Sequence, residues 1–347
     1  MYRARGLLAQ RRGKPEEAVA AYTRSLEIDP GSGFALGRRA QAYRAADNTA
    51  LALADAASAI AKDPTWVDMY LLRANLFRSE RRPAEAIAEA SALMKANPEN
   101  VEAHVAAARI LAALDRRADA MRVFDRAMAI RPDSLTLINR AQTRASEDVA
   151  GRRADLEAAV KLEADATSAW ALLAELHQEQ GDEAAALKSW NAAIAAEPDS
   201  AGALAGRGLL HARAGRMPAA EKDLAAARAL AKEPFELNGL CWSKATAGLM
   251  LASALAECDA ALTKQPGAPS TLDSRALVYL RLGRFDEALA DYDAALAKAP
   301  KQTSSLFGRA VVWARKGEKA KSDADAAAAL AINPDIERQY ASYKIAR

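Results

Sequence analysis

The stretch "NGLCWSKATAG", residues 238–248, holds the residues with the most chemistry to offer, because a cysteine and a tryptophan are adjacent in it. Cys241 is one of two cysteines in 347 residues, and the other is Cys258. A cysteine acts as a nucleophile or a metal ligand through its thiolate, which a neighbouring cation or imidazole must favour. No His or Lys is placed to do this, so the sequence predicts neither a catalytic nor a metal-binding thiol.

Other catalytic signatures are also missing. "GLLAQRRGK" (6–14) and "GSGFALG" (31–37) contain glycines, but not at the spacing of loops that hold a phosphate or a dinucleotide. His104, His177 and His211 are isolated from one another, and no cluster of His, Cys and carboxylates suggests a metal. No nucleophile is paired with a base. We therefore expect no enzyme activity, no cofactor and no metal.

Composition narrows the class of partner. The chain is 51% hydrophobic but only 5% aromatic, and its formal net charge is +3. So small a charge does not indicate nucleic-acid binding. No apolar run is long enough to span a membrane, and "MYRARGLLAQRRGK" is too charged for a signal peptide.

A period of 34 residues defines the elements that position these side chains. It is marked by prolines at Pro30, Pro64, Pro98 and Pro132, and it continues through Pro198, Pro266, Pro300 and Pro334. Alanines stand twelve residues before these prolines, at Ala18, Ala52, Ala86, Ala120, Ala186, Ala254 and Ala288, and only Ser322 departs from the rule. Glycines mark the middle of several units, at Gly13, Gly181, Gly283 and Gly317. Each unit is therefore predicted to be a helix, a short turn and a second helix that a proline ends.

The stretch "TLDSRALVYLRLGRFDEALADYDAALAKAP" (271–300) resembles the tetratricopeptide repeat, a helix–turn–helix of 34 residues. The matching positions are Ala276, Tyr279, Gly283, Ala288, Tyr292, Ala295 and Pro300. Ten such units cover essentially the whole chain. The fifth departs from the pattern, because it is two residues short and has Ala164 where proline is expected. The seventh has Lys232 in the proline position and Pro234 two residues later.

The resemblance implies an all-α fold, a right-handed superhelix of about ten hairpins over residues 1–334. Any flexure is expected at the shortened repeat, 133–164, and residues 335–347 are expected to form a solvating, capping C-terminal helix. Met1 falls inside the first predicted helix, so we expect the chain to be a fragment of something longer.

In this family, ligands usually lie along the concave groove formed by the first helices. Carried over residue by residue, the groove presents Arg38, Gln41, Arg44, Asn75, Arg78 and Arg109 in the N-terminal half. In the C-terminal half it presents Asn238, Trp242, Asp273, Leu277, Arg281, Phe307 and Arg315. Aromatic residues beside arginines are the usual anchors of an interface, so the C-terminal half is the favoured peptide site. The alternative for each residue is an ordinary, partly covered side chain.

Two better-defined groove types of the family fit less well. Relatives that bind chaperone carboxylates use Lys, Asn and Arg, and Arg38, Gln41, Asn75 and Arg78 are only loosely similar to that set, with no lysine. Relatives fused to sugar transferases carry an asparagine ladder. The equivalent positions here are mixed, namely Arg38, Leu72, Ala106, Asn139, Leu172 and Gly206, which argues against that activity.

The two cysteines fall on opposite helices of the eighth hairpin, in positions that face each other in the family. Their sulfurs could therefore approach bonding distance, and a Cys241–Cys258 disulfide would imply an oxidising compartment such as the bacterial periplasm. The alternative is two buried thiols in a reducing cytoplasm. "LCWSKATAG…ECDAAL" is also similar to C-terminal repeats of proteobacterial, often exported, members of the family.

These observations favour a non-catalytic scaffold that binds a peptide or a protein partner in the concave groove. The main alternative is an accessory domain of a larger enzyme whose catalytic part is absent from this chain. A third hypothesis is weak self-association through the end repeats, in place of a monomer.

Overall fold

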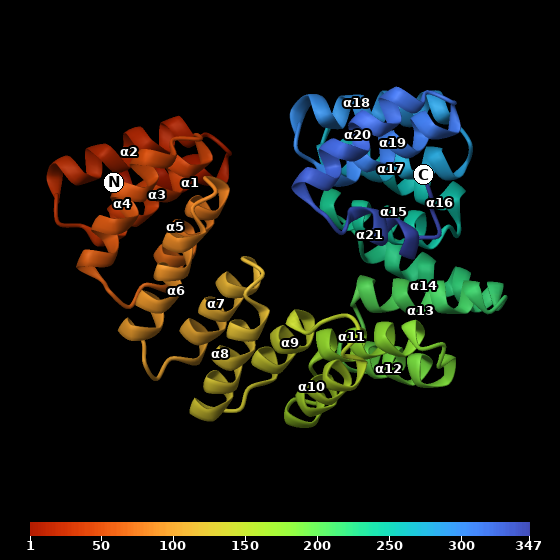
Figure 1. The fold of residues 1–347 in the computed structure, drawn as a ribbon, viewed down its shortest axis with the longest axis horizontal. Coiled ribbons are helices and arrows are strands. Elements are labelled where there is room, and N and C mark those ends of the chain that lie inside the picture. The colour runs from red at the N-terminus through yellow and green to blue at the C-terminus, as the bar shows by residue number, and fades with distance from the viewer. The chain divides into compact units, whose positions relative to one another are not determined.

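The computed structural model describes all residues 1–347, and its regular elements are α-helices joined by short turns (Figure 1). It divides into two compact units, residues 1–169 and 170–347. The first unit contains α1 (Tyr2–Arg11), α2 (Pro15–Ile28), α3 (Gly33–Ala45), α4 (Thr49–Lys62), α5 (Val67–Ser79), α6 (Pro83–Ala96), α7 (Val101–Ala112), α8 (Arg117–Ile130), α9 (Ser134–Thr143) and α10 (Val149–Leu162).

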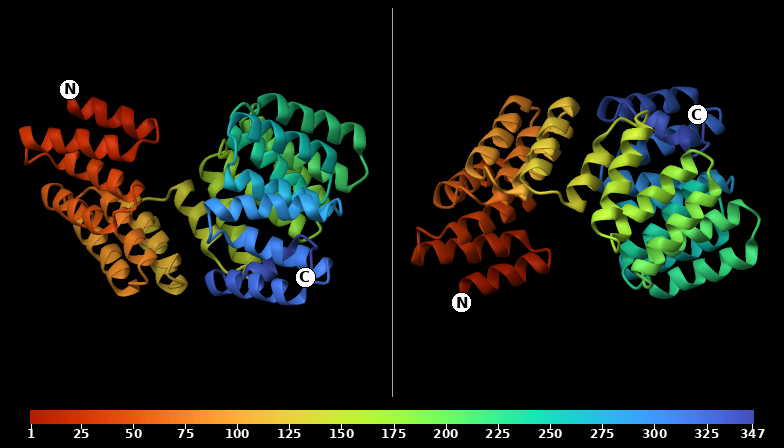
Figure 2. Two further views of the ribbon diagram at one scale, coloured as in Figure 1. Left: turned by 90° about the horizontal axis from the view of Figure 1, so that it is seen from above. Right: turned by 90° about the horizontal axis from the view of Figure 1, so that it is seen from below.

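The boundary between the units falls within α11 (Thr167–Glu179). The second unit continues with α12 (Glu183–Ala196), α13 (Ala201–Arg213), α14 (Met217–Leu230), α15 (Pro234–Ala247), α16 (Leu251–Lys264), α17 (Pro269–Arg281), α18 (Phe285–Lys298), α19 (Thr303–Arg315), α20 (Lys319–Ile332) and α21 (Ile336–Ser342). Successive helices from α1 to α20 pair into ten hairpins, and within each unit the hairpins stack side by side (Figure 2). The predicted all-α fold of helix–turn–helix repeats is confirmed, whereas the single array over 1–334 and a flexure at 133–164 stay predictions.

The turn inside most hairpins uses one residue in the left-handed backbone region. Its φ is positive at Gly13, Gly181, Gly215, Gly283 and Gly317, and the same position is taken by Asp47, Arg81 and Asp115 in three hairpins of the first unit. Glycine adopts this conformation without a steric cost, which explains why it recurs at this point of the period. The eighth hairpin differs, because Gly248 and Met250 both have positive φ there.

Small residues let the two helices of each hairpin approach closely. Every alanine that stands twelve residues before a proline of the period is fully buried, namely Ala18, Ala52, Ala86, Ala120, Ala186, Ala254 and Ala288. A Cβ atom added to Gly6 would lie only 2.6 Å from the ring of Tyr22, which is itself fully buried. The sequence period is therefore a packing period.

A repeated ion-pair arrangement joins neighbouring hairpins. Arg275 on α17 binds both carboxylate oxygens of Asp291 on α18, at 2.7 and 2.8 Å, and its third nitrogen lies 2.7 Å from Asp259 on α16. One guanidinium thus connects three helices. The same geometry recurs at Arg309 with Asp325 and Asp293, at Arg207 with Asp223 and Asn191, and at Arg39 with Asp55 and Thr23. Because these pairs are bidentate and partly buried, they hold the helices more firmly than exposed pairs would.

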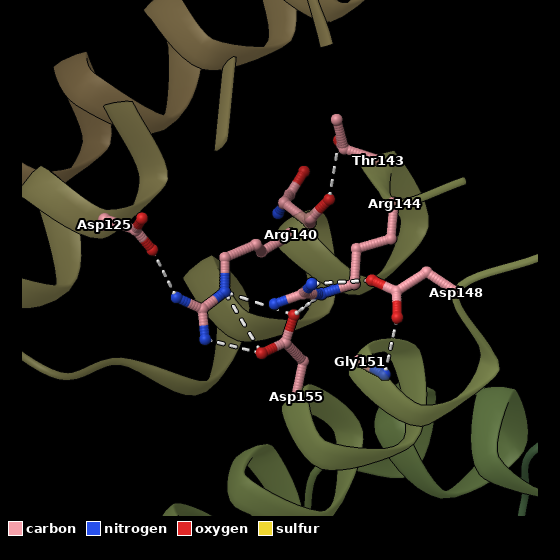
Figure 3. Close-up of polar contacts among 8 residues, drawn as sticks. Asp125, Arg140, Thr143, Arg144, Asp148, Gly151 and Asp155 are labelled. Carbon is pink, nitrogen blue, oxygen red and sulfur yellow. Dashed lines mark hydrogen bonds and ion pairs between the residues drawn. The ribbon is translucent and has the colours of Figure 1, made fainter. Parts of the chain in front are cut away.

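The shortened fifth repeat uses two arginines for the same purpose (Figure 3). Arg140 and Arg144, both reaching from the first-helix side of this hairpin, bind the buried carboxylate of Asp155 on α10. Arg140 also lies 2.7 Å from Asp125 on α8, and Arg144 lies 2.7 Å from Asp148, which accepts a hydrogen bond from Gly151 N at the start of α10. The missing residues are therefore accommodated with the ion-pair arrangement intact.

Candidate functional site

One face of the second unit is covered by a peptide segment of the chain itself. Residues 336–347, which comprise α21 and the turn after it, lie across the first helices α15, α17 and α19. We call the surface formed by α15, α17 and α19 the first-helix face. The segment buries Ile336, Tyr340 and Ile345 in the same apolar cluster as residues of these helices. The expected solvating role of 335–347 therefore differs from what the structure has, because apolar side chains on one side of the segment find a matching surface.

Aromatic contacts fix the segment to the first-helix face. The ring of Tyr340 packs on Phe307 of α19 with centroids 4.9 Å apart, and Tyr343 meets Trp242 of α15 edge to face at 5.9 Å. Tyr340 also donates its hydroxyl hydrogen to the carbonyl of Ser304, at 2.7 Å. Both geometries are favourable for the quadrupoles of aromatic rings.

Two arginines bind the main chain of the segment. Arg281 of α17 donates to the carbonyl of Tyr343 at 2.5 Å, and it also donates to the carbonyls of Ala245 and Thr246 at the end of α15, each at 2.8 Å. Arg315 of α19 donates to the carbonyl of Ala346 at 3.2 Å. These bonds recognise backbone, so they would be available to any peptide in the same path.

A carboxyl group lies buried beneath the segment. Asp273 of α17 is 4% exposed and accepts hydrogen bonds from Ser304 and Ser305, at 2.8 and 2.6 Å, but forms no ion pair. Burial raises the pKa of Asp273 to about 6, against the opposing effect of the two hydroxyls.

Space remains at both ends of the segment. A cavity of about 280 Å³ lies beside Ile345 and is lined by Leu280, Phe285, Val311 and Arg315, among others. On the other side, a hollow of about 570 Å³ extends from Tyr343 and Trp242 across α15 to α13 and α11, where Trp190, Gly206 and Arg213 line it. The segment therefore fills only part of the surface.

The residues predicted for the C-terminal half of the groove all lie on the first helices, but several are not exposed. Asp273, Leu277 and Phe307 are buried, Asn238, Trp242 and Arg281 are half-buried, and Arg315 is exposed. The expectation that Trp242 has no packing role is wrong, because Tyr343 packs against it. The cause in each case is the 336–347 segment, or for Leu277 the cluster formed with neighbouring helices.

The predicted residues of the N-terminal half lie on the first helices α3 and α5 of the first unit. Arg38 is half-buried, stacks on Phe34 at 5.4 Å and donates to Gln41 at 3.2 Å, while Arg78 donates to Asn75 at 3.4 Å. Arg44 and Arg78 are exposed.

The eighth hairpin joins its two helices covalently. The sulfurs of Cys241 on α15 and Cys258 on α16 lie 2.04 Å apart, and both residues are fully buried. Next to them Lys244 and Glu257 form an ion pair that is almost entirely buried, and Lys244 also donates to Ser253 at 2.8 Å. Glu257 precedes Asp291 by 34 residues, but α15 has no arginine, so Lys244 supplies the cation.

The repeats can now be compared with known proteins. A model described as tetratricopeptide repeat matches residues 3–65, 172–234 and 274–335, which is more than half of the chain, and a second model of the same description matches 77–145. The chain belongs to the tetratricopeptide repeat family. Repeats of this family imply a role in protein–protein interaction, and none of the helices is long and apolar enough to cross a membrane.

Solved structures of the family are similar in fold. The yeast Tom70 structure matches 99% of this chain and 93% of that chain, with 13% identity and a TM-score of 0.54. The type IV pilus biogenesis factor PilW matches 57% of this chain and 92% of its own, with 19% identity and a TM-score of 0.44, and the P58(IPK) repeat domain matches 91% and 98%, with 20% identity and a TM-score of 0.28. No curated protein matches the sequence. At these identities only the shared fold follows.

Two features escaped the sequence analysis although the sequence contains a signal for each. The arginine–aspartate arrangement shows as Arg and Asp sixteen residues apart, for example Arg275 with Asp259 and Asp291. The segment shows as apolar residues spaced four and five apart, at Ile336, Tyr340 and Ile345, within an otherwise polar stretch.

Proposed function

We propose that this tetratricopeptide repeat protein is a non-catalytic scaffold and that the first-helix face of its second unit binds a peptide segment of a protein partner. The observation that supports this most directly is that the face already holds a peptide, residues 336–347, through contacts of the kind that recognise peptides.

The chemistry of the face suits such a ligand. Arg281 and Arg315 supply charged donors for main-chain carbonyls, and Trp242 and Phe307 supply flat apolar surfaces for side chains. Arg and Trp are the residue types that most often dominate binding energy at interfaces. The donors fix the path of the peptide, and the aromatic surfaces select its side chains.

The test begins with peptides selected from a displayed random library on the immobilised full chain. We expect Trp242→Ala and Arg315→Ala each to weaken the best peptide by about tenfold or more, which is the effect of losing 1.4 kcal/mol of contact. Arg228→Ala is the matched control, because Arg228 is exposed on the second helix α14 and forms no ion pair. Isothermal titration calorimetry measures all four affinities. Equal affinities for the wild type and the two groove variants would contradict the proposal.

The first unit offers a second candidate surface, for an acidic segment. Arg44, Arg78 and Arg109 are exposed, lie on successive first helices and form no ion pair, and Arg38 on α3 also lacks a carboxylate partner. An octaglutamate peptide is the probe. We expect binding that weakens as salt is added and that is lost in the Arg44→Ala/Arg78→Ala variant but kept in Arg228→Ala. Binding that the double substitution leaves unchanged would refute this surface.

A further inference from the structure

We infer that residues 336–347 act as an intramolecular occupant that keeps the peptide site of the second unit closed until a partner segment of similar chemistry displaces them. This rests on the proposed function, since it assigns regulation and a ligand class to the same face. The partner segment is defined by what the present occupant shows: two aromatic side chains three residues apart, followed two residues later by a bulky apolar side chain.

The segment is built in a way that permits release. Its helix, α21, has only seven residues, which is too short to be stable without its packing surface. Unlike the twenty helices before it, α21 has no hairpin partner. Its other side is exposed at Glu337, Ala341 and Ser342. The first-helix face alone therefore keeps the segment in place.

The aromatic pair explains the ligand class. Tyr340 and Tyr343 are three residues apart, so both side chains point to the same side of a single helical turn. One meets Phe307 and the other meets Trp242, on helices α19 and α15. A partner needs this spacing to reach both surfaces at once.

The third position of the pattern is Ile345, and its surroundings are incompletely filled. Although Ile345 is buried, the cavity of about 280 Å³ beside it is bounded by Leu280, Phe285 and Val311. An aromatic side chain at the equivalent position of a partner would fill more of this space and gain contacts that Ile345 does not make. A partner can therefore bind the face better than the occupant does.

A longer partner gains contacts at the other end as well. The hollow of about 570 Å³ continues from Tyr343 past Trp242 to Gly206 and Trp190, beyond the reach of the segment. Such contacts matter because a tethered occupant competes with an effective concentration in the millimolar range. A free peptide is then weakened by the small fraction of molecules in which the face is open.

The probe is a fluorescein-labelled synthetic peptide with the sequence of residues 334–347, added to the full chain. Tyr343→Ala weakens the occupant without touching the face, because its partner Trp242 stays in place. Fluorescence anisotropy is expected to show at least about tenfold tighter binding to Tyr343→Ala than to the wild type. Glu337→Gln, an exposed change on α21, is the control and is expected to bind like the wild type. A peptide carrying Ile345→Phe is expected to bind more tightly than the natural sequence to every chain.

The outcomes separate the two proposals. Measurable and equal affinity for the wild type and Tyr343→Ala would overturn the occupant model and leave the peptide site standing. Absence of binding to either chain, at peptide concentrations into the millimolar range, would overturn both.

A second measurement needs no substitution in the occupant. Hydrogen exchange of the wild-type chain is expected to show amides of 337–346 opening more readily than those of α17 and α19, with opening increased in Trp242→Ala. Protection of 337–346 equal to that of α17 and α19 would overturn the occupant model.

Discussion

At the scale of single residues, Asp273 is a buried carboxyl group that has hydroxyl partners but no cation. Its raised pKa of about 6 means that the folded state binds a proton more tightly than the unfolded state, where the pKa is about 3.8. Its stabilising contribution is therefore fully present below about pH 4 and is lost as the pH rises to about 6.

This gives a pH-dependent prediction. Asp273→Asn keeps a hydrogen-bonding group but cannot ionise, so the variant should lack this loss. Between pH 4.5 and 7, we expect the free energy of unfolding of the wild type to fall by about 2 kcal/mol relative to the variant, measured by urea denaturation at both pH values. A parallel pH dependence in the two chains would show that the carboxyl titrates normally.

Lys244 and Glu257 present the opposite case, in which two buried charges neutralise each other. Lys244→Met should leave Glu257 buried without a cation and lower the free energy of unfolding by about 3–5 kcal/mol. The double substitution Lys244→Met/Glu257→Leu should recover most of that loss. Lys188→Met, at an exposed position of α12, should change stability by less than about 0.5 kcal/mol in the same urea experiment. A double variant as unstable as the single one would argue against the buried pair as the cause.

At the scale of elements, the eighth hairpin is held by a disulfide between α15 and α16, with the two cysteines 17 residues apart. Closing a loop of this length restricts the unfolded chain. Cys241→Ala/Cys258→Ala should therefore lose about 3 kcal/mol of unfolding free energy.

Reductant supplies the control for this prediction, because it should destabilise the wild type and leave the double variant unchanged. Titration of thiols under denaturing, non-reducing conditions should find none in the wild type. Two free thiols there would contradict the disulfide.

The elements also show which parts of the fold are predictable from sequence. The hairpins are predictable because helix, turn and packing requirements coincide at each period, so that Ala254 or Gly283 is constrained by several of them. The path of residues 336–347 is not, because a short amphipathic helix such as α21 can cap a stack or fold onto another face with the same residues. The surface positions of the groove are predictable from the family, but their exposure is not, as Phe307 and Asp273 demonstrate.

At the scale of the whole molecule, each unit has apolar clusters of its own. Three clusters of the second unit draw all their buried members from residues 170–347, among them Trp190, Leu237 and Tyr292. A stack of repeats is stabilised by contacts between neighbours, so a unit with complete clusters should fold without the rest.

We therefore expect a fragment of residues 170–347 to be helical by circular dichroism, to unfold cooperatively in urea and to bind a groove peptide as tightly as the full chain. A fragment that begins at Ala205, inside α13, lacks Trp190 and the N-cap residue Ser200 and should unfold at lower urea. A non-cooperative transition of the 170–347 fragment would show that the second unit needs the first.

The two arginines that hold main-chain carbonyls separate where a ligand lies from which ligand it is. Arg281 and Arg315 act on atoms that every peptide has, whereas selection falls to a few side chains such as Phe285 and Val311. Natural drift in those few positions could change the preferred sequence while the seating of the backbone is inherited unchanged. For an engineer, the same division makes this unit a reprogrammable receptor, in which a small library at the apolar positions explores new specificities on a constant frame.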